Sequence, residues 1–141
     1  MVSDGLTISA ALADDLVAHA RAEMPNEACG LLSGDLASGN ATAYHPARNA
    51  DASPSVYTVH PDDLVRIIFG VEDAQRDLVA IFHSHTHTPA VPSPTDRRSA
   101  RYPDAFYLIA TLADPDARPA ESLRAWRIRD GESREVPLLI G

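Results

Sequence analysis

The sequence predicts a single α/β domain spanning residues 1–141, built on a mixed β-sheet flanked by helices. Three observations predict this class. The chain has about the length of one domain, and its 45% hydrophobic content is enough for one buried core. Segments with helical periodicity alternate with strand-like segments. Residues 78–82, Leu-Val-Ala-Ile-Phe, form an uninterrupted apolar run, which is typical of a central strand covered on both faces.

The first predicted strand and helix lie before residue 25. Residues 6–8 form a short apolar strand, and Ser9 is a suitable N-cap for a helix over residues 10–23. Pro25 follows the helix and ends it. The predicted buried stripe of this helix consists of Leu12, Leu16, Val17 and Ala20.

A β-hairpin and a second helix are predicted next. Residues 29–34 read as a buried strand that leads into a Gly39-Asn40 turn, after which residues 41–48 return antiparallel. The remaining elements of this half are a loop at 49–55, a strand at 56–59 and a helix from Pro61 to about residue 75. After the central strand we expect a loop at 86–92, a short helix, and strands near 105–112, 122–129 and 135–139.

Composition narrows the function classes. The net charge of −8 opposes binding to nucleic acid phosphates, and all twelve basic residues are Arg, which excludes lysine-based chemistry such as Schiff bases. The single Cys29 excludes an intrachain disulfide and a thiolate zinc ribbon, so a cytoplasmic protein is expected. Charges throughout the first 24 residues argue against a signal peptide or a membrane span.

The chemistry is predicted to lie where the central strand ends. Side chains alternate along a strand, so His83 and His85 point to one face and can bind one ion. Asp96, at the start of the next short helix, can supply the third ligand of a catalytic zinc site with an open position. Two alternatives stay open: Ser93 and Asp96 can simply cap that helix, and His87 can join the two histidines in a three-histidine site.

A zinc hydrolase also needs a base to accept a proton from the attacking water. Glu27, just before the strand at 29–34, is the best candidate among six Glu residues, although it could equally be a solvated loop carboxylate. Cys29 itself is expected to be a buried apolar residue rather than a nucleophile. Arg97, Arg98 and Arg101 follow the motif and could hold an acidic partner, but a solvated helix face is the simpler interpretation.

The sequence resembles the JAMM (MPN+) metallopeptidase family, whose motif of an upstream Glu and H-S-H-x7-S-x2-D is matched by Glu27, His83-Ser84-His85, Ser93 and Asp96. The resemblance covers nearly the whole chain and is greatest to the bacterial branch. It implies a cytidine-deaminase-like (JAB/MPN) α/β fold and one Zn²⁺ per chain held by His83, His85 and Asp96. Glu27 would be the general base, and Ser93 would hydrogen-bond the oxyanion.

Within that branch the sequence is most similar to actinobacterial hydrolases that release cysteine from a ubiquitin-like sulfur-carrier protein, as the stretch Pro25-Asn26-Glu27-Ala28-Cys29-Gly30 illustrates. This resemblance implies a partner with a flexible Gly-Gly C-terminus that carries cysteine. Nucleic acid and membrane partners are not expected, and a homodimer is allowed. The alternatives are an isopeptidase that removes such a protein from target lysines, and a non-catalytic MPN scaffold.

Overall fold

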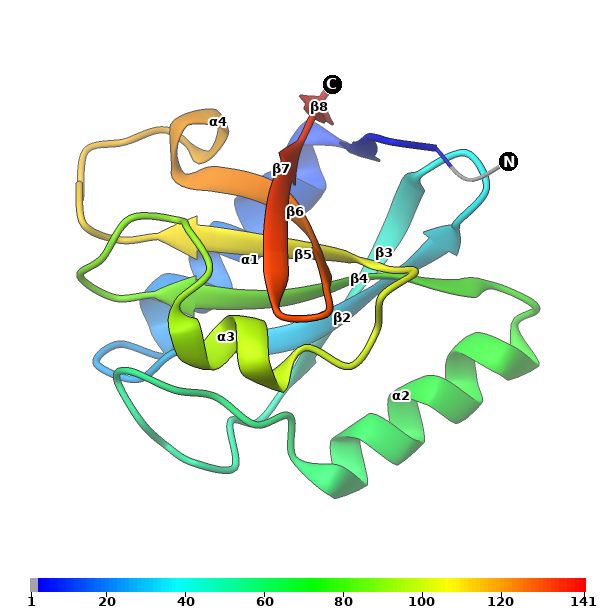
Figure 1. Ribbon diagram of the computed structural model, residues 1–141, viewed down its shortest axis with the longest axis horizontal. Helices are drawn as coiled ribbons and strands as arrows, with labels where there is room; N and C mark the ends of the chain where they lie inside the picture. The colour runs from blue at the N-terminus through cyan, green and yellow to red at the C-terminus, as the bar shows by residue number, and fades with distance from the viewer. Residues whose placement is uncertain (1–2) are drawn as a thin grey trace.

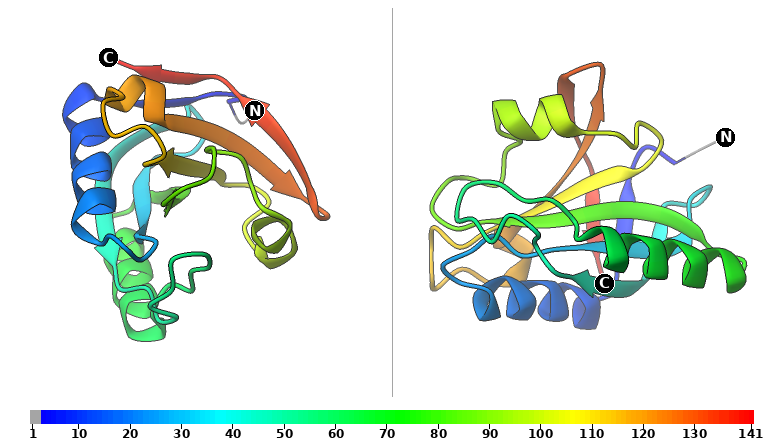
Figure 2. Two further views of the ribbon diagram at one scale, coloured as in Figure 1. Left: turned by 90° about the vertical axis from the view of Figure 1, so that its left-hand side faces the viewer. Right: turned by 90° about the horizontal axis from the view of Figure 1, so that it is seen from below.

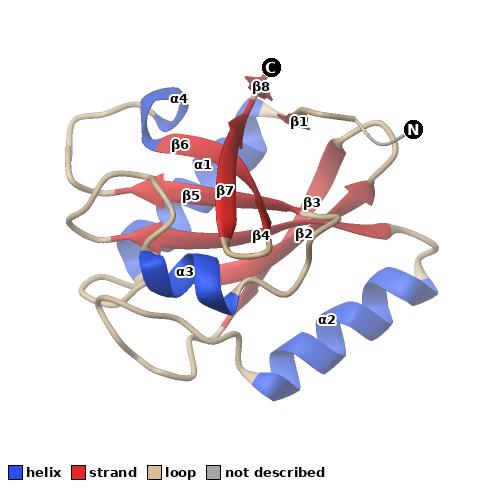
Figure 3. Ribbon diagram, viewed as in Figure 1, coloured by secondary structure: helices blue, strands red, loops and turns tan. Residues whose placement is uncertain are grey.

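A computed structural model describes residues 3–141, and in this part of the chain eight strands form one sheet with four helices around it (Figures 1 and 3). None of the described helices is long and apolar enough to cross a bilayer. The strands are β1 (Leu6–Ile8), β2 (Cys29–Asp35), β3 (Asn40–Ala47), β4 (Asp77–His85), β5 (Phe106–Thr111), β6 (Leu123–Arg129), β7 (Glu132–Val136) and β8 (Leu138–Ile140). The helices are α1 (Ala10–Ala22), α2 (Pro61–Asp73), α3 (Pro94–Ser99) and α4 (Pro119–Ser122).

The sheet is mixed, as predicted. Its strand order is β7-β6-β5-β4-β2-β3-β1-β8, with β4 near the centre. The β4–β5, β1–β3 and β1–β8 pairs are parallel, and the other pairs are antiparallel. The predicted hairpin of β2 and β3 is present, and Gly39 adopts a φ of 76° in its turn, a conformation that glycine accepts without strain.

Local signals in the sequence account for the starts of the two long helices. The Ser9 hydroxyl accepts a hydrogen bond from the Leu12 N–H at 3.0 Å and caps α1. Pro61 opens α2, where its missing N–H costs nothing, and Asp62 lies in the first turn, where the helix dipole favours negative charge. Both helices end within two residues of the predicted positions.

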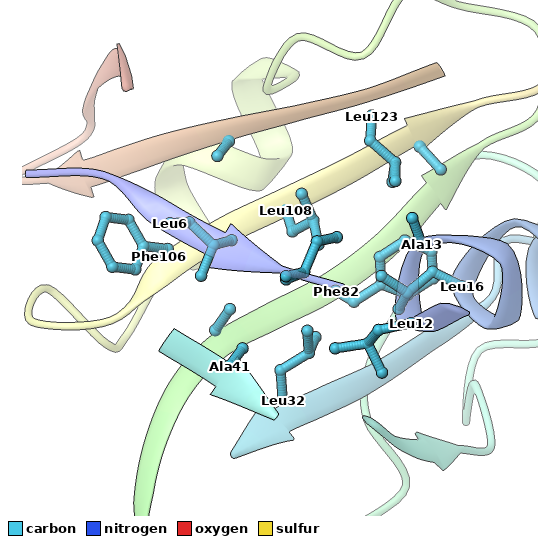
Figure 4. Close-up of a cluster of buried hydrophobic side chains, with 14 of the residues drawn as sticks. Leu6, Leu12, Ala13, Leu16, Leu32, Ala41, Phe82, Phe106, Leu108 and Leu123 are labelled. Carbon is cyan, nitrogen blue, oxygen red and sulfur yellow. The ribbon is translucent and has the colours of Figure 1, made fainter. Parts of the chain in front are cut away.

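The two faces of the sheet are covered by different helices. α1 and α3 lie on opposite sides of the sheet (Figure 2). On the α1 side, Leu12 and Leu16 pack on Leu32, Phe82 and Leu108 (Figure 4). On the other side, the second hydrophobic cluster joins residues of α2 to alternate residues of the same strands; it includes Leu31, Ile67, Val71, Ile81, Tyr107 and Trp126. Coverage on both faces explains why β4 is apolar without interruption.

Because side chains alternate along β4, each of its last residues can be assigned to one face of the sheet. Phe82 belongs to the cluster under α1, and Ile81 belongs to the cluster on the opposite side. By the period of two, Ser84 follows Phe82, whereas His83 and His85 follow Ile81 onto the α2 and α3 side. The two histidines are thus delivered to the face where α3 lies.

Two strand predictions were wrong. Residues 56–59 form no strand; only an isolated bridge joins Asn49 to Val59, and the segment is a loop that lies beside the histidines. The strand expected at 135–139 is divided at Pro137 into β7 and β8, which lie at opposite edges of the sheet. Pro137 has no N–H for a continuing ladder, and its carbonyl accepts the Leu6 N–H at 3.0 Å instead. The short helix α4 was not predicted.

Gly30 provides a test of how closely the backbone of β2 packs against Tyr44 and His45 of β3. A Cβ at this position would lie 2.6 Å from the Tyr44 hydroxyl and from the His45 carbonyl oxygen, so Gly30→Ala should destabilise the protein by about 1–3 kcal/mol. The matched control is Gly70→Ala in α2, where a Cβ meets no atom within 4 Å and helix propensity should add up to about 1 kcal/mol. Urea denaturation measures both values; equal stability of the two variants would contradict the packing argument.

Candidate metal centre

Three side chains converge at the end of β4. The Nε2 atoms of His83 and His85 lie 3.1 Å apart, and each is close to Oδ2 of Asp96, at 3.1 and 3.0 Å respectively. All three residues are buried, with exposed fractions of 0, 3 and 8%. Among residues 3–141, this is the one group of three that could hold a metal ion. The structure therefore brings together the three ligands predicted from the motif.

The first turn of α3 positions Asp96. The Ser93 hydroxyl accepts the Asp96 N–H at 3.0 Å, and Oδ2 of Asp96 accepts the Ser93 N–H at 2.9 Å. This reciprocal capping box makes the simpler interpretation of Ser93 and Asp96 correct as well. The same carboxylate oxygen caps the helix and faces the histidines. Burial alone would raise the pKa of Asp96, but hydrogen bonds from His83, His85 and the Ser93 N–H hold that pKa well below its usual range.

Hydrogen bonding selects the protonation of His85. Its Nδ1 lies 2.7 Å from the Pro89 carbonyl oxygen and donates to it. The protonated ring also donates through Nε2 to Asp96, and loss of that Nε2 proton leaves a neutral ring whose Nε2 lone pair is directed at the cluster. Burial lowers the pKa of His83. For His85, burial also acts to lower the pKa, but Asp96 and the Pro89 carbonyl outweigh it and raise the value. The His83 ring stacks on Tyr57, with centroids 4.3 Å apart and planes inclined by 19°.

These donors fit a divalent ion. Tetrahedral zinc with bonds of about 2.0–2.1 Å to nitrogen and oxygen places neighbouring donor atoms about 3.3 Å apart, close to the spacing of the three atoms here. Two imidazole nitrogens and one carboxylate oxygen are also a common ligand set for catalytic zinc. A single ion would compensate two imidazole lone pairs and one carboxylate that otherwise crowd each other in a buried site.

The pairing of β2 with β4 places Glu27 beside the cluster. In this antiparallel register Cys29 lies opposite His83, and extending the register by two residues places Glu27 opposite His85. Glu27 has the same parity as Cys29 and Leu31, which face α2, so its side chain shares the face of the histidines. Glu27 is only 3% exposed, and its Oε1 has no hydrogen-bond partner within the described chain.

The surroundings of Glu27 tune its acidity. Burial raises the pKa of Glu27 from 4.5 to about 7; the positive charge of His85 opposes this shift and the Asp96 carboxylate adds to it. A carboxyl group whose pKa lies near neutrality can both accept and donate a proton at physiological pH. This interpretation replaces the alternative of a solvated loop carboxylate, which burial excludes.

Comparison with known proteins agrees with this geometry. Residues 9–129 match the family model described as prokaryotic homologs of the JAB domain. The chain belongs to this JAB, or JAMM, family. It is 40% identical over 133 residues to the "CysO-cysteine peptidase" of Mycobacterium tuberculosis, covering 94% of this chain and 89% of that protein. It is 39% identical over 123 residues to the "Desampylase" of Haloferax volcanii, covering 84% and 86%.

A solved structure extends the match to three dimensions. The solution structure of protein DSY2949 from Desulfitobacterium hafniense matches with a TM-score of 0.85 and 30% identity, covering 96% of this chain and 92% of that one. The predicted JAB/MPN fold and the JAMM family assignment are thereby confirmed. With peptidase relatives of this similarity, the chain is a JAMM-type hydrolase.

The supporting roles of three residues at the JAMM site were not predicted from the sequence, although Ser84 lies within the matched motif. The Ser84 hydroxyl accepts the Ala28 N–H at 2.8 Å and so fastens the start of β2 next to Glu27. Asn49 donates through Nδ2 to the Glu27 carbonyl at 3.1 Å. Tyr57 comes from the segment wrongly predicted as a strand. The one available signal was Ser84, a polar residue at an α1-facing position of an otherwise apolar strand.

Two alternatives for other residues are also decided by the structure. His87 is exposed and lies beyond the end of β4, where its Nδ1 is 2.9 Å from the Thr86 hydroxyl, so it is not part of the cluster. The Cys29 side chain is buried, and burial raises the pKa of its thiol to about 12, which leaves it protonated at neutral pH. Cys29 is therefore a buried packing residue, as expected.

The raised pKa of Glu27 predicts a pH-dependent stability in metal-free protein. Between pH 4.5 and about 7 the native state binds more protons at Glu27 than the unfolded state, so its free energy of unfolding should fall as pH rises through this window. The loss relative to Glu27→Gln should be roughly 2 kcal/mol after allowance for solvent screening. Urea denaturation of both proteins in excess chelator from pH 4.5 to 8 measures it. A constant difference between them would contradict the shift.

Proposed function

We propose that this JAMM hydrolase uses zinc to cleave the amide bond between the C-terminal glycine of a ubiquitin-like sulfur-carrier protein and cysteine. The proposal assigns one ion per chain to His83, His85 and Asp96. The observation that carries it is the convergence of these three ligand atoms within 3.1 Å of one another beside a buried carboxyl group. The "CysO-cysteine peptidase" relative, similar over 94% of the chain, supports the choice of substrate.

In this proposal Glu27 moves the proton. When bound, a divalent ion supplies Lewis-acid chemistry, which polarises a carbonyl and makes water a better nucleophile at neutral pH. Glu27 accepts a proton from water as the water oxygen attacks the glycine carbonyl carbon, and then donates it to the cysteine nitrogen as the C–N bond breaks. The products are the carrier with a free carboxylate and cysteine. The raised pKa of Glu27 suits both transfers.

Ser93 is proposed to stabilise the oxyanion. Its Oγ already accepts the Asp96 N–H at 3.0 Å, so the hydroxyl proton is free to be donated to the carbonyl oxygen as negative charge develops there. The capping box fixes the position of this donor before substrate binds. Removal of such a donor typically costs about 10²–10³ in kcat.

The first prediction of this proposed function concerns the metal. Wild-type protein should hold about one zinc per chain after dialysis, and His85→Ala should hold much less, because it removes one of three protein ligands. His87→Ala is the matched control: it changes an exposed histidine two residues away and should keep the metal. Elemental analysis measures the content of all three. Metal loss in His87→Ala equal to that in His85→Ala would contradict the ligand set.

The second prediction separates the base from the ligands. Glu27→Gln should retain the zinc content of wild type but lose about 10²–10⁴ in kcat, because the amide cannot accept the proton. The substrate is CysO, taken as the carrier from the name of the mycobacterial relative, with a C-terminal cysteine; cysteine release is followed by mass spectrometry. Turnover close to wild type in this variant, with metal present, would show that Glu27 is not the general base.

The second candidate function is an isopeptidase, because the desampylase of Haloferax volcanii is nearly as similar to this chain. The same experiment distinguishes the two when a lysine-linked carrier adduct is compared with the cysteine adduct. A preference for cysteine supports the first function, and a preference for the lysine adduct supports the second. A scaffold without activity would cleave neither.

A further inference from the structure

The arginines that follow the metal-site motif line a hollow next to α3. This hollow has a volume of about 640 Å³, and four of its lining residues are Arg97, Arg98, Arg101 and Arg129, against one carboxylate from Asp130. It lies where α3 faces the turn between β6 and β7, and both Figure 1 and Figure 2 show these two segments side by side. We call it the arginine hollow.

The positive charge of the arginine hollow is poorly compensated. Within residues 3–141, Arg97, Arg98 and Arg101 have no carboxylate within 4 Å, and Arg129 has only Asp104 at 3.5 Å. The guanidinium of Arg97 donates to the Pro92 carbonyl at 3.2 Å, and that of Arg98 donates to the Thr95 hydroxyl at 3.3 Å. Both groups therefore donate to neutral acceptors, and no carboxylate within the described residues compensates their charge.

A neighbouring hollow shows that arginine clustering alone does not produce this imbalance. The second hollow, about 460 Å³ in volume, is also lined by arginines, but the same number of acidic residues balances them. Its lining includes Arg127, Arg129 and Arg134 together with Asp4, Asp104 and Glu132. The three guanidinium groups without a carboxylate partner, from Arg97, Arg98 and Arg101, are thus a local property of α3 and the residues that follow it, in a chain of net charge −8.

The arginine hollow adjoins a third hollow on the same side of the sheet as the candidate metal site. Arg101 also lines this hollow, which has a volume of about 360 Å³ and is lined by Tyr57, Tyr102 and Tyr107. Tyr57 stacks on His83, so one wall of this tyrosine-lined hollow is a side chain that contacts a predicted metal ligand. The backbone N–H of Arg101 donates to the Tyr107 hydroxyl at 3.0 Å, which fixes the end of α3 between the two hollows.

We propose that the arginine hollow binds a carboxylate-bearing surface of the ubiquitin-like carrier while the tail of the carrier reaches the metal centre. This inference rests on the proposed function. In a chain of net charge −8, a local group of arginines without carboxylate partners attracts the carboxylates of a partner and can orient the encounter. Guanidinium groups pair with carboxylates through two parallel hydrogen bonds, which suits them to this contact.

The test compares charge reversals of equal size inside the arginine hollow and outside it. Arg98→Glu and Arg101→Glu each change the net charge by −2 in the arginine hollow. Arg76→Glu makes the same change at an exposed position just before β4, at the end of that strand opposite to the histidines. Binding of CysO to each variant is measured by calorimetry at about 0.05 M and about 0.5 M salt, since screening weakens exposed ionic contacts.

Arg98→Glu and Arg101→Glu should each weaken the binding of CysO at low salt by about tenfold, while Arg76→Glu stays within about twofold of wild type. High salt should weaken wild-type binding and reduce the difference among the variants. Equal affinities for all variants, or no binding by wild type, would overturn the proposal that the arginine hollow binds the carrier. Circular dichroism confirms that each variant is folded.

Hydrolysis of the CysO–cysteine adduct by wild type is measured separately. If the adduct is cleaved while all variants bind equally, the proposed function stands without this surface. If the hollow binds CysO but no adduct is cleaved, the surface stands and the proposed hydrolase function fails. In the expected case, the two reversals raise KM on the adduct and leave kcat near wild type, because neither residue contacts the reacting atoms.

Discussion

The antiparallel pairing of β2 with β4 is the constraint on which the site depends. It places Cys29 opposite His83, and it thereby fixes how far Glu27 lies from His85. Because side chains alternate, a register shift of one residue would turn Glu27 toward α1 and leave the histidines without it. The Ser84 hydroxyl reinforces the register at the point where β2 begins, since it accepts the Ala28 N–H at 2.8 Å. Both the apolar residues of β4 and Ser84 thus hold the register that places Glu27 beside the histidines.

The third ligand arrives by a different route, through local helix chemistry rather than sheet pairing. α3 has only six residues and begins with Ser93 as N-cap and Pro94 in its first turn. The capping box orients the Asp96 carboxylate so that one oxygen serves both the helix terminus and the histidines. Stabilising the helix and directing the carboxylate at the histidines therefore depend on the same interaction, which explains why the motif allows both a capping and a metal-binding interpretation.

Most of the architecture and the site could be predicted because the signals are local. The apolar run of β4, the caps at Ser9 and Ser93, and Pro61 each act within a few residues of the element they define. The failures came from partners distant in sequence. Residues 56–59 have strand-like composition, but no neighbouring strand is available to them, and Tyr57 packs on His83 instead. Pro137 was likewise read as part of one strand, although β8 pairs with β1, more than 130 residues earlier.

The burial of the polar cluster has a thermodynamic consequence for the rest of the fold. Glu27, His83, His85 and Asp96 are at most 8% exposed, and two of their polar atoms lack a hydrogen-bond partner in the described chain. Such groups typically cost about 1–3 kcal/mol each, so they oppose folding. The two hydrophobic clusters on either side of β4 offset this cost. The polar end of β4 is therefore held in place by the burial of its apolar part.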